Sequence, residues 1–194
     1  MSVKAKYSLV FQPYEAELNY IKSIKYKLAE QIGWFSSKDV LAHISIAEFE
    51  ANDTELDSVV AYLTDFVLSE NRQYLYFDQY ASFPTLGTWF IKPTVPSKLY
   101  MQEICKSLWK DMPIPLTHLP AELHLTIARK LSQEQLQIAK NLLKQIDFDF
   151  LCDQLVLRKF DPQLRQYQPY AAFKFQGLPK VRITSDEQGQ INLF

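Results

Sequence analysis

Two tetrapeptides of one pattern, 81 residues apart, constrain the fold of this chain more than any other feature of its sequence. The first is HISI at residues 43–46 and the second is HLTI at residues 124–127. Polar and aliphatic residues alternate in both, so an extended strand would carry the imidazole and the hydroxyl on one face and the aliphatic side chains on the other. The sequence therefore predicts two strands that each present a histidine and a hydroxyl.

The elements predicted around the two tetrapeptides follow the same order of helix, motif strand and helix. Apolar residues at helical spacing predict helices that begin near Glu15, Asn52, Ser97 and Ser132. Strands are predicted at residues 6–11, 40–49, 74–83, 88–92, 123–129, 148–158 and 170–175, with a polar connection at 161–168 and a terminal hairpin formed by 181–184 and 191–194. This order indicates an approximate structural duplication in an α+β fold, with antiparallel or mixed sheets and helices packed outside them.

The two motif strands together would supply two proton carriers and two hydroxyl donors. One of His43 and His124 can take a proton from an attacking oxygen while the other gives a proton to a departing oxygen. Ser45 and Thr126 can hold the non-bridging oxygens on which charge accumulates. These side chains suit work on a phosphodiester, and the scheme needs no metal.

Composition excludes several other classes of protein. The chain has 194 residues, 47% of them hydrophobic, and only 4 glycines, which argues against a disordered chain or a glycine-rich nucleotide loop. A formal charge of −1 argues against a protein that coats long nucleic acids. Cys105 and Cys152 lack metal-ligand spacing, and the N-terminal residues lack the apolar stretch of a leader. Both cysteines are therefore interpreted as reduced core thiols of a cytoplasmic protein. No metal site and no membrane span are expected.

Three further residues near the motifs have open roles. Arg129 matches the geometry of a phosphate, but strict alternation points it away from His124 and Thr126 unless the strand ends or bulges there. Glu48 alternates to the face opposite His43, which predicts a solvated carboxylate. His118 lies in a proline-flanked segment and is predicted to be a histidine of a surface loop.

With both tetrapeptides in view, the chain resembles the two-histidine (2H) phosphoesterase superfamily, which includes the 2′-5′ RNA ligase-like proteins and cyclic phosphodiesterases. The longer match is HLTIAR at residues 124–129, and HISI at 43–46 fits the looser first motif. The resemblance implies a single bilobal domain over residues 1–194, with 178–194 as a C-terminal hairpin or tail. Two pseudo-symmetric lobes, each an antiparallel sheet flanked by helices, would form a central cleft that carries the motifs.

The leading hypothesis is a metal-independent phosphodiesterase that acts on cyclic or 2′-5′ phosphodiesters of nucleotides or RNA ends. Its expected site comprises His43 and His124 for catalysis and Ser45, Thr126 and Arg129 for binding phosphate, with no cofactor. The expected partner is a small nucleotide or an RNA end, and the chain is expected to be a monomer. A non-catalytic module that binds nucleotides or RNA ends and a reversible 2′-5′ RNA ligase are the alternatives, and the sequence does not assign which histidine is the acid.

Overall fold

Two antiparallel four-stranded sheets flanked by helices make up the fold, so the predicted α+β class is confirmed. The computed structural model describes residues 3–179, 184–185 and 191–192. The first sheet has the order β2-β1-β7-β8, and the second has the order β5-β4-β3-β6. The strands are β1 (Ala5–Phe11), β2 (Ile44–Ala51), β3 (Gln73–Phe83), β4 (Thr88–Pro93), β5 (Leu125–Ala128), β6 (Phe148–Cys152), β7 (Gln154–Asp161) and β8 (Gln166–Lys174).

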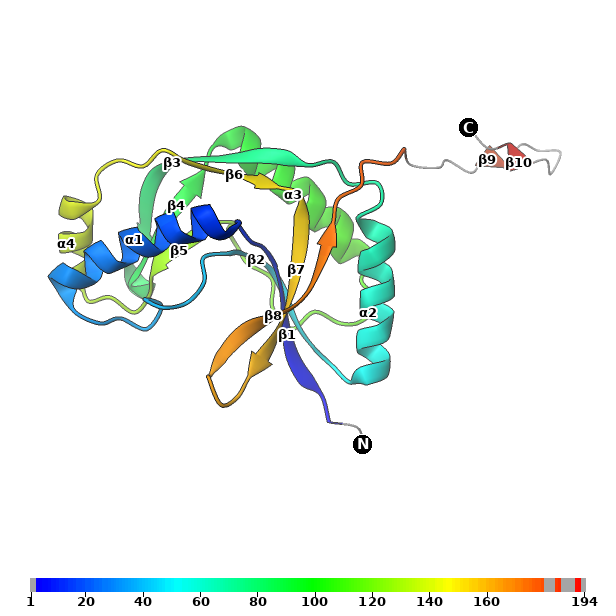
Figure 1. Ribbon diagram of the computed structural model, residues 1–194, viewed down its shortest axis with the longest axis horizontal. Coiled ribbons are helices and arrows are strands. Elements are labelled where there is room, and N and C mark those ends of the chain that lie inside the picture. Colours follow the sequence, from blue (N-terminus) through cyan, green and yellow to red (C-terminus); the bar gives the residue numbers. More distant parts are fainter. Residues whose placement is uncertain (1–2, 180–183, 186–190, 193–194) are drawn as a thin grey trace.

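In the described part of the chain, four α-helices cover the two sheets in pairs (Figure 1). They are α1 (Glu15–Ile32), α2 (Asp53–Phe66), α3 (Val95–Lys110) and α4 (Gln133–Leu142). The blue α1 and the yellow α4 lie side by side, and α1 also packs against β5. On the other side of the molecule, the Tyr62 hydroxyl of α2 donates to the Leu108 carbonyl of α3 at 2.9 Å. All four predicted helices are therefore present.

Local capping explains where two of these helices begin. The Asn52 side chain accepts from the backbone N–H of Glu55, and the Glu55 carboxylate accepts from the backbone N–H of Asn52. Ser132 and Gln135 make the same reciprocal pair at the start of α4, which begins where the sequence predicts. Such capping boxes satisfy two backbone donors that the first helical turn leaves without partners.

The hairpin between β3 and β4 turns through a short 3₁₀ helix, Pro84–Leu86, and the glycine after it. Gly87 is buried and has the left-handed backbone conformation, with φ 60° and ψ 33°. Its carbonyl accepts from the backbone N–H of Leu131 at 2.9 Å. A Cβ at this position would lie 2.7 Å from Leu131 N and closer still to the Leu131 carbonyl oxygen. The turn is thus fitted tightly against the chain that follows the second motif.

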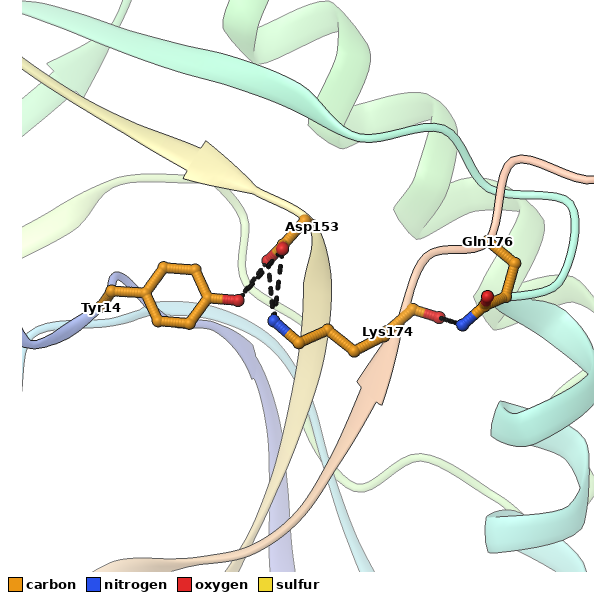
Figure 2. A network of polar contacts seen from close by, with 4 residues as sticks. All are labelled: Tyr14, Asp153, Lys174 and Gln176. Atoms are coloured by element: carbon orange, nitrogen blue, oxygen red, sulfur yellow. Dashed lines mark hydrogen bonds and ion pairs between the residues drawn. The ribbon is translucent and has the colours of Figure 1, made fainter.

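The prediction of one strand over residues 148–158 is wrong, because the chain breaks at Asp153 and changes sheet. β6 pairs with β3 in the second sheet, whereas β7 pairs with β1 in the first. Figure 2 shows how the crossing is held: the Asp153 carboxylate accepts from the Tyr14 hydroxyl at 2.7 Å and from Lys174 Nζ at 3.2 Å. The Lys174 carbonyl in turn accepts from the Gln176 side-chain amide at 3.1 Å. The crossing is therefore tied to the start of α1 and to the end of β8.

Strands are exchanged between the two halves of the chain. The first half runs β1, α1, β2, α2, β3, and the second runs β4, α3, β5, α4, β6, β7, β8. β3 leaves the first half to pair with β4, and β7 leaves the second half to pair with β1. The predicted order of helix, motif strand and helix is present in both halves, but each sheet also contains strands from the other half.

The remaining predictions on the fold have mixed outcomes. The predicted strand at 170–175 starts earlier, so the β7–β8 connection comprises only residues 162–165. Thr184–Ser185 pairs with Ile191–Asn192 (β9 and β10), and the rest of the predicted terminal hairpin lies outside the described residues. Cys105 and Cys152 are free and buried, as predicted. None of the helices in the described part of the chain is long and apolar enough to cross a membrane. The single domain over residues 1–194 stays a prediction.

Candidate active site

One cavity of about 550 Å³ brings together all five residues predicted from the sequence to form the site. It is lined from the first motif by His43 and Ser45 and from the second by His124, Thr126 and Arg129. The motifs belong to different sheets, since β2 is in the first and β5 is in the second. The cavity therefore has one wall from each lobe.

Each histidine directly precedes its motif strand, and each imidazole is held by the same kind of hydrogen bond. The predicted strands at 40–49 and 123–129 begin later in the structure, at Ile44 and Leu125. His43 Nδ1 is 2.7 Å from the Leu41 carbonyl oxygen, and His124 Nδ1 is 2.9 Å from the Glu122 carbonyl oxygen. A carbonyl only accepts, so each Nδ1 carries a proton and donates it. Nε2 of each ring is thereby left for a ligand.

The His124 ring is also packed between aromatic side chains. Its centroid lies 4.6 Å from the ring of Phe90 and 5.4 Å from that of Phe83, which it meets edge to face. These contacts limit rotation of the imidazole. His124 is therefore oriented both by a hydrogen bond and by packing.

A β-bulge follows the hydroxyl residue in both motifs and decides which later side chains face the cavity. Ser45 pairs with Val10 while Ala47 pairs with Leu9, so Ile46 is the extra residue of the first bulge. Thr126 pairs with Phe90 while Ala128 pairs with Trp89, so Ile127 is the extra residue of the second. A bulge shifts the side-chain alternation by one position.

The shifted alternation brings the third residue after each hydroxyl residue to the cavity. Arg129 follows Thr126 by three positions and lines the cavity, which resolves the orientation that simple alternation left open. Glu48 follows Ser45 by three positions and also lines it, so the predicted orientation of Glu48 away from His43 is wrong. The signal missed in the sequence is the Ile-Ala pair after each hydroxyl residue, which interrupts the polar–apolar alternation in both motifs.

The two hydroxyls are available to a ligand. Ser45 and Thr126 are half-buried at the cavity wall. Within the described part of the chain, neither hydroxyl takes part in a hydrogen bond. A hydroxyl can donate one bond and accept two. Each can therefore donate to an oxygen atom placed in the cavity.

Comparison with known proteins gives the family. Residues 15–163, most of the chain, match the 2′-5′ RNA ligase superfamily. The chain belongs to this superfamily. The proposed resemblance to the two-histidine phosphoesterases is thereby confirmed. A comparison with curated protein sequences gives no match.

Solved structures share the fold of this superfamily member at low sequence identity. E. coli LigT in apo form has a TM-score of 0.67 at 11% identity, over 89% of this chain and 98% of that one. E. coli LigT complexed with 3′-AMP has a TM-score of 0.61 at 10% identity, over 89% and 99%. Usb1 from Kluyveromyces marxianus has a TM-score of 0.56 at 12% identity, over 88% and 98%. These likenesses extend over nearly the whole of each chain.

Burial and nearby cations keep both imidazoles of this superfamily member from gaining a proton easily. The pKa of His43 is held well below its usual 6.5, first by burial and then by the positive charges of Arg158, Lys25 and Arg129. The pKa of His124 is also lowered by burial, but the nearby Glu122 carboxylate and the hydrogen bond to its carbonyl oppose the change. At His43 only the hydrogen bond to the Leu41 carbonyl opposes burial and three cations, whereas at His124 the cation Arg129 is offset by the Glu122 carboxylate, so the neutral form is favoured more strongly at His43.

Sequence reasoning missed two buried cations near His43. Lys25 of α1 is 2% exposed and lines the cavity. Its position within the apolar stripe of α1 was the available signal, since Ile21 and Leu28 lie four residues before and three after it. Arg158 of β7 is 3% exposed, and burial lowers its pKa to about 10. Its Nη2 donates to Ser8 Oγ at 3.2 Å.

The rim of the cavity contains the third histidine. His118 is exposed, as predicted for a surface loop. Its backbone nevertheless pairs with β2, because its carbonyl accepts from the Glu48 N–H at 2.9 Å. His118 therefore lines the cavity at the side of Glu48. The Glu48 carboxylate accepts from the Tyr167 hydroxyl at 3.4 Å.

Proposed function

We propose that the protein is a metal-independent phosphodiesterase that acts on cyclic or 2′-5′ phosphodiesters of nucleotides or RNA ends. One observation carries the proposal: two imidazoles, each directly before a strand of a different sheet, line one cavity, and each has its Nδ1 bonded to a carbonyl two residues earlier. This leaves a pair of Nε2 atoms for proton transfer. The E. coli relative LigT has been solved complexed with 3′-AMP, which supports a nucleotide as the ligand here.

In the proposed reaction the two histidines act as base and acid. His43 is the better base because the cations around it favour its neutral form, and its Nε2 would take a proton from water. The water oxygen then forms a bond to phosphorus in a 2′,3′-cyclic phosphate. The bond from phosphorus to one ribose oxygen breaks, and protonated His124 gives its proton to that oxygen. A nucleoside monophosphate is the product.

A 2′-5′ linkage would be cleaved by the same groups with an internal nucleophile. His43 would take the proton of the neighbouring 3′-hydroxyl, whose oxygen then attacks phosphorus. The 5′-oxygen would leave with a proton from His124, giving a 2′,3′-cyclic phosphate. In both reactions Ser45, Thr126 and Arg129 would donate to the non-bridging oxygens, where negative charge grows in the transition state.

The deciding experiment is a screen of nucleoside 2′,3′-cyclic phosphates and 2′-5′-linked dinucleotides in EDTA. Loss of either imidazole is expected to lower kcat by about 10²- to 10⁴-fold, the usual contribution of a positioned acid or base. The variants are His43→Ala, His124→Ala and the double variant, with circular dichroism to verify the fold. Turnover by the double variant at the parental rate would refute the proposal, and activity that disappears with EDTA would refute its metal independence.

Two alternative functions use the same cavity. A non-catalytic module would bind 3′-AMP or a cyclic phosphate, measured by calorimetry, and would release no product. A reversible ligase would join an RNA 2′,3′-cyclic phosphate end to a 5′-hydroxyl end, which is cleavage of a 2′-5′ linkage in reverse. Incubation of end-labelled RNA fragments separates ligation from hydrolysis. The cytoplasmic location and monomeric state also stay predictions.

A further inference from the structure

Lys25 is a buried cation in the cavity wall that the proposed reaction leaves without a role. Its side chain is 2% exposed and lies beside the same cavity as His43, Ser45 and Thr126. Among the described residues it is in no ion pair with a carboxylate. Instead, Lys25 Nζ donates to the Val40 carbonyl at 2.7 Å and to the Ser37 carbonyl at 3.2 Å.

These two carbonyls belong to the segment that leads into the first motif and touches the second. Residues 36–40 form the turns between α1 and His43. Ser37 is buried, and its hydroxyl donates to the Ile127 carbonyl of β5 at 3.4 Å. The neighbouring Ser36 hydroxyl donates to the Arg129 carbonyl, also at 3.4 Å. The ammonium therefore binds at the junction between the backbones of the two motifs.

Stability of the fold does not account for a charge at this position. Burial and, to a smaller extent, the positive charge of Arg129 lower the pKa of Lys25 to about 8, although the negative charge of Asp39 opposes the change. A buried ion that lacks a full ion pair is destabilising compared with an apolar side chain of similar size. An ammonium has three donors, and the two carbonyls use two of them. The third N–H can therefore bond to an oxygen atom of a ligand.

We propose that Lys25 is a positioning residue for the reaction proposed above: it fixes the segment before His43 to α1, where the serines of the segment reach the second motif, and its charge attracts the phosphodiester into the cavity. This inference depends on the proposed function for the reaction that Lys25 serves. The backbone bonds act on kcat, because they set where the His43 imidazole lies relative to Thr126. The charge acts on KM and on the affinity for phosphate. The two contributions can therefore be measured separately.

Three substitutions separate the contributions. Lys25→Met removes both the charge and the donors, Lys25→Gln keeps an amide that can donate to the carbonyls, and Lys25→Arg keeps the charge. Lys27→Met is the matched control, because Lys27 is an exposed lysine of the same helix. For each variant, kcat and KM are measured on a nucleoside 2′,3′-cyclic phosphate. Calorimetry gives the affinity for inorganic phosphate, and thermal unfolding reports the fold.

Lys25→Met is expected to lower kcat by about 10- to 100-fold, the range expected when a reacting group is misplaced by about 1 Å. It is also expected to raise KM and weaken phosphate binding, without lowering the melting temperature. Lys25→Gln should recover part of kcat but not the affinity for phosphate, whereas Lys25→Arg should recover the affinity. If Lys25→Met does not fold, Lys25→Gln and Lys25→Arg still decide through phosphate binding.

The inference is overturned if Lys25→Met and Lys25→Gln match Lys27→Met within twofold in kcat, KM and phosphate affinity. Failure of the proposed function has a different signature. In that case the wild-type protein hydrolyses none of the phosphodiesters, yet phosphate calorimetry still compares the variants. Equal phosphate affinity in Lys25→Met and Lys27→Met would then refute the binding role of Lys25.

Discussion

Gly87→Ala is expected to be among the more destabilising small substitutions in this protein. The left-handed backbone at Gly87 costs a residue with a Cβ about 1–2 kcal/mol. The new methyl would also lie 2.7 Å from Leu131 N, so the backbone must move, at about 1–3 kcal/mol for a methyl forced into packed surroundings. Together these give a loss of about 2–5 kcal/mol in the free energy of unfolding, measured by equilibrium denaturation in urea.

Gly177→Ala is the matched control. Gly177 also has a positive φ, 65°, but the nearest atom to its added Cβ is the side-chain oxygen of Asn71, at 3.0 Å. A flexible side chain can move away, so only the backbone term of about 1–2 kcal/mol is expected. Equal losses for the two variants would refute the reasoning about contact with Leu131. Gly87→Ala should also weaken phosphate binding, because Leu131 follows Arg129 by two residues.

Three further outcomes are expected. The rate constant kcat/KM should follow a bell-shaped pH profile with its maximum below pH 6.5, because His43 must be neutral and His124 protonated while both pKa values are lowered in the free protein; a maximum above pH 7 would contradict this. Arg129→Ala should lower kcat/KM by about 10- to 150-fold, equivalent to the 1.5–3 kcal/mol of a charged hydrogen bond, and the exposed Arg72→Ala serves as its control. Asp153→Ala should lower the free energy of unfolding by about 1–3 kcal/mol through its bonds to Tyr14 and Lys174, and the idea fails if the exposed Asp149→Ala costs as much.

Local patterns in the sequence predicted the helices and strands of this fold better than they predicted which strands pair. Helix starts at Asn52 and Ser132 were predictable because capping depends on residues three positions apart. The break at Asp153 was not, because the polar pair Asp153-Gln154 that interrupts residues 148–158 is equally compatible with one strand, and nothing in it indicates a change of sheet. Pairing with β3 or with β1 depends on residues far away in the chain, which a local pattern does not contain.

The two histidines of the candidate site were predictable from the sequence, but the places of Glu48 and Lys25 in the cavity wall were not. His43 and His124 were found because two identical patterns are unusual in a chain with only 3 histidines. Glu48 was misplaced because simple alternation was carried through a bulge. Lys25 was missed because a single charged residue in a helical stripe gives no sign of which segment it will meet. Its partners are carbonyl oxygens, which sequence patterns do not identify.

The exchange of strands between the halves has a consequence for how the two proton carriers are kept together. Cutting the chain between β3 and β4 would deprive β1 of its neighbour β7 and β4 of its neighbour β3. Each fragment would then expose an unpaired strand edge, which favours association with another chain. Neither half is therefore expected to form an autonomous unit that could gain or lose its histidine independently. We therefore expect the two histidines to reach their places in the cavity only when both halves fold together.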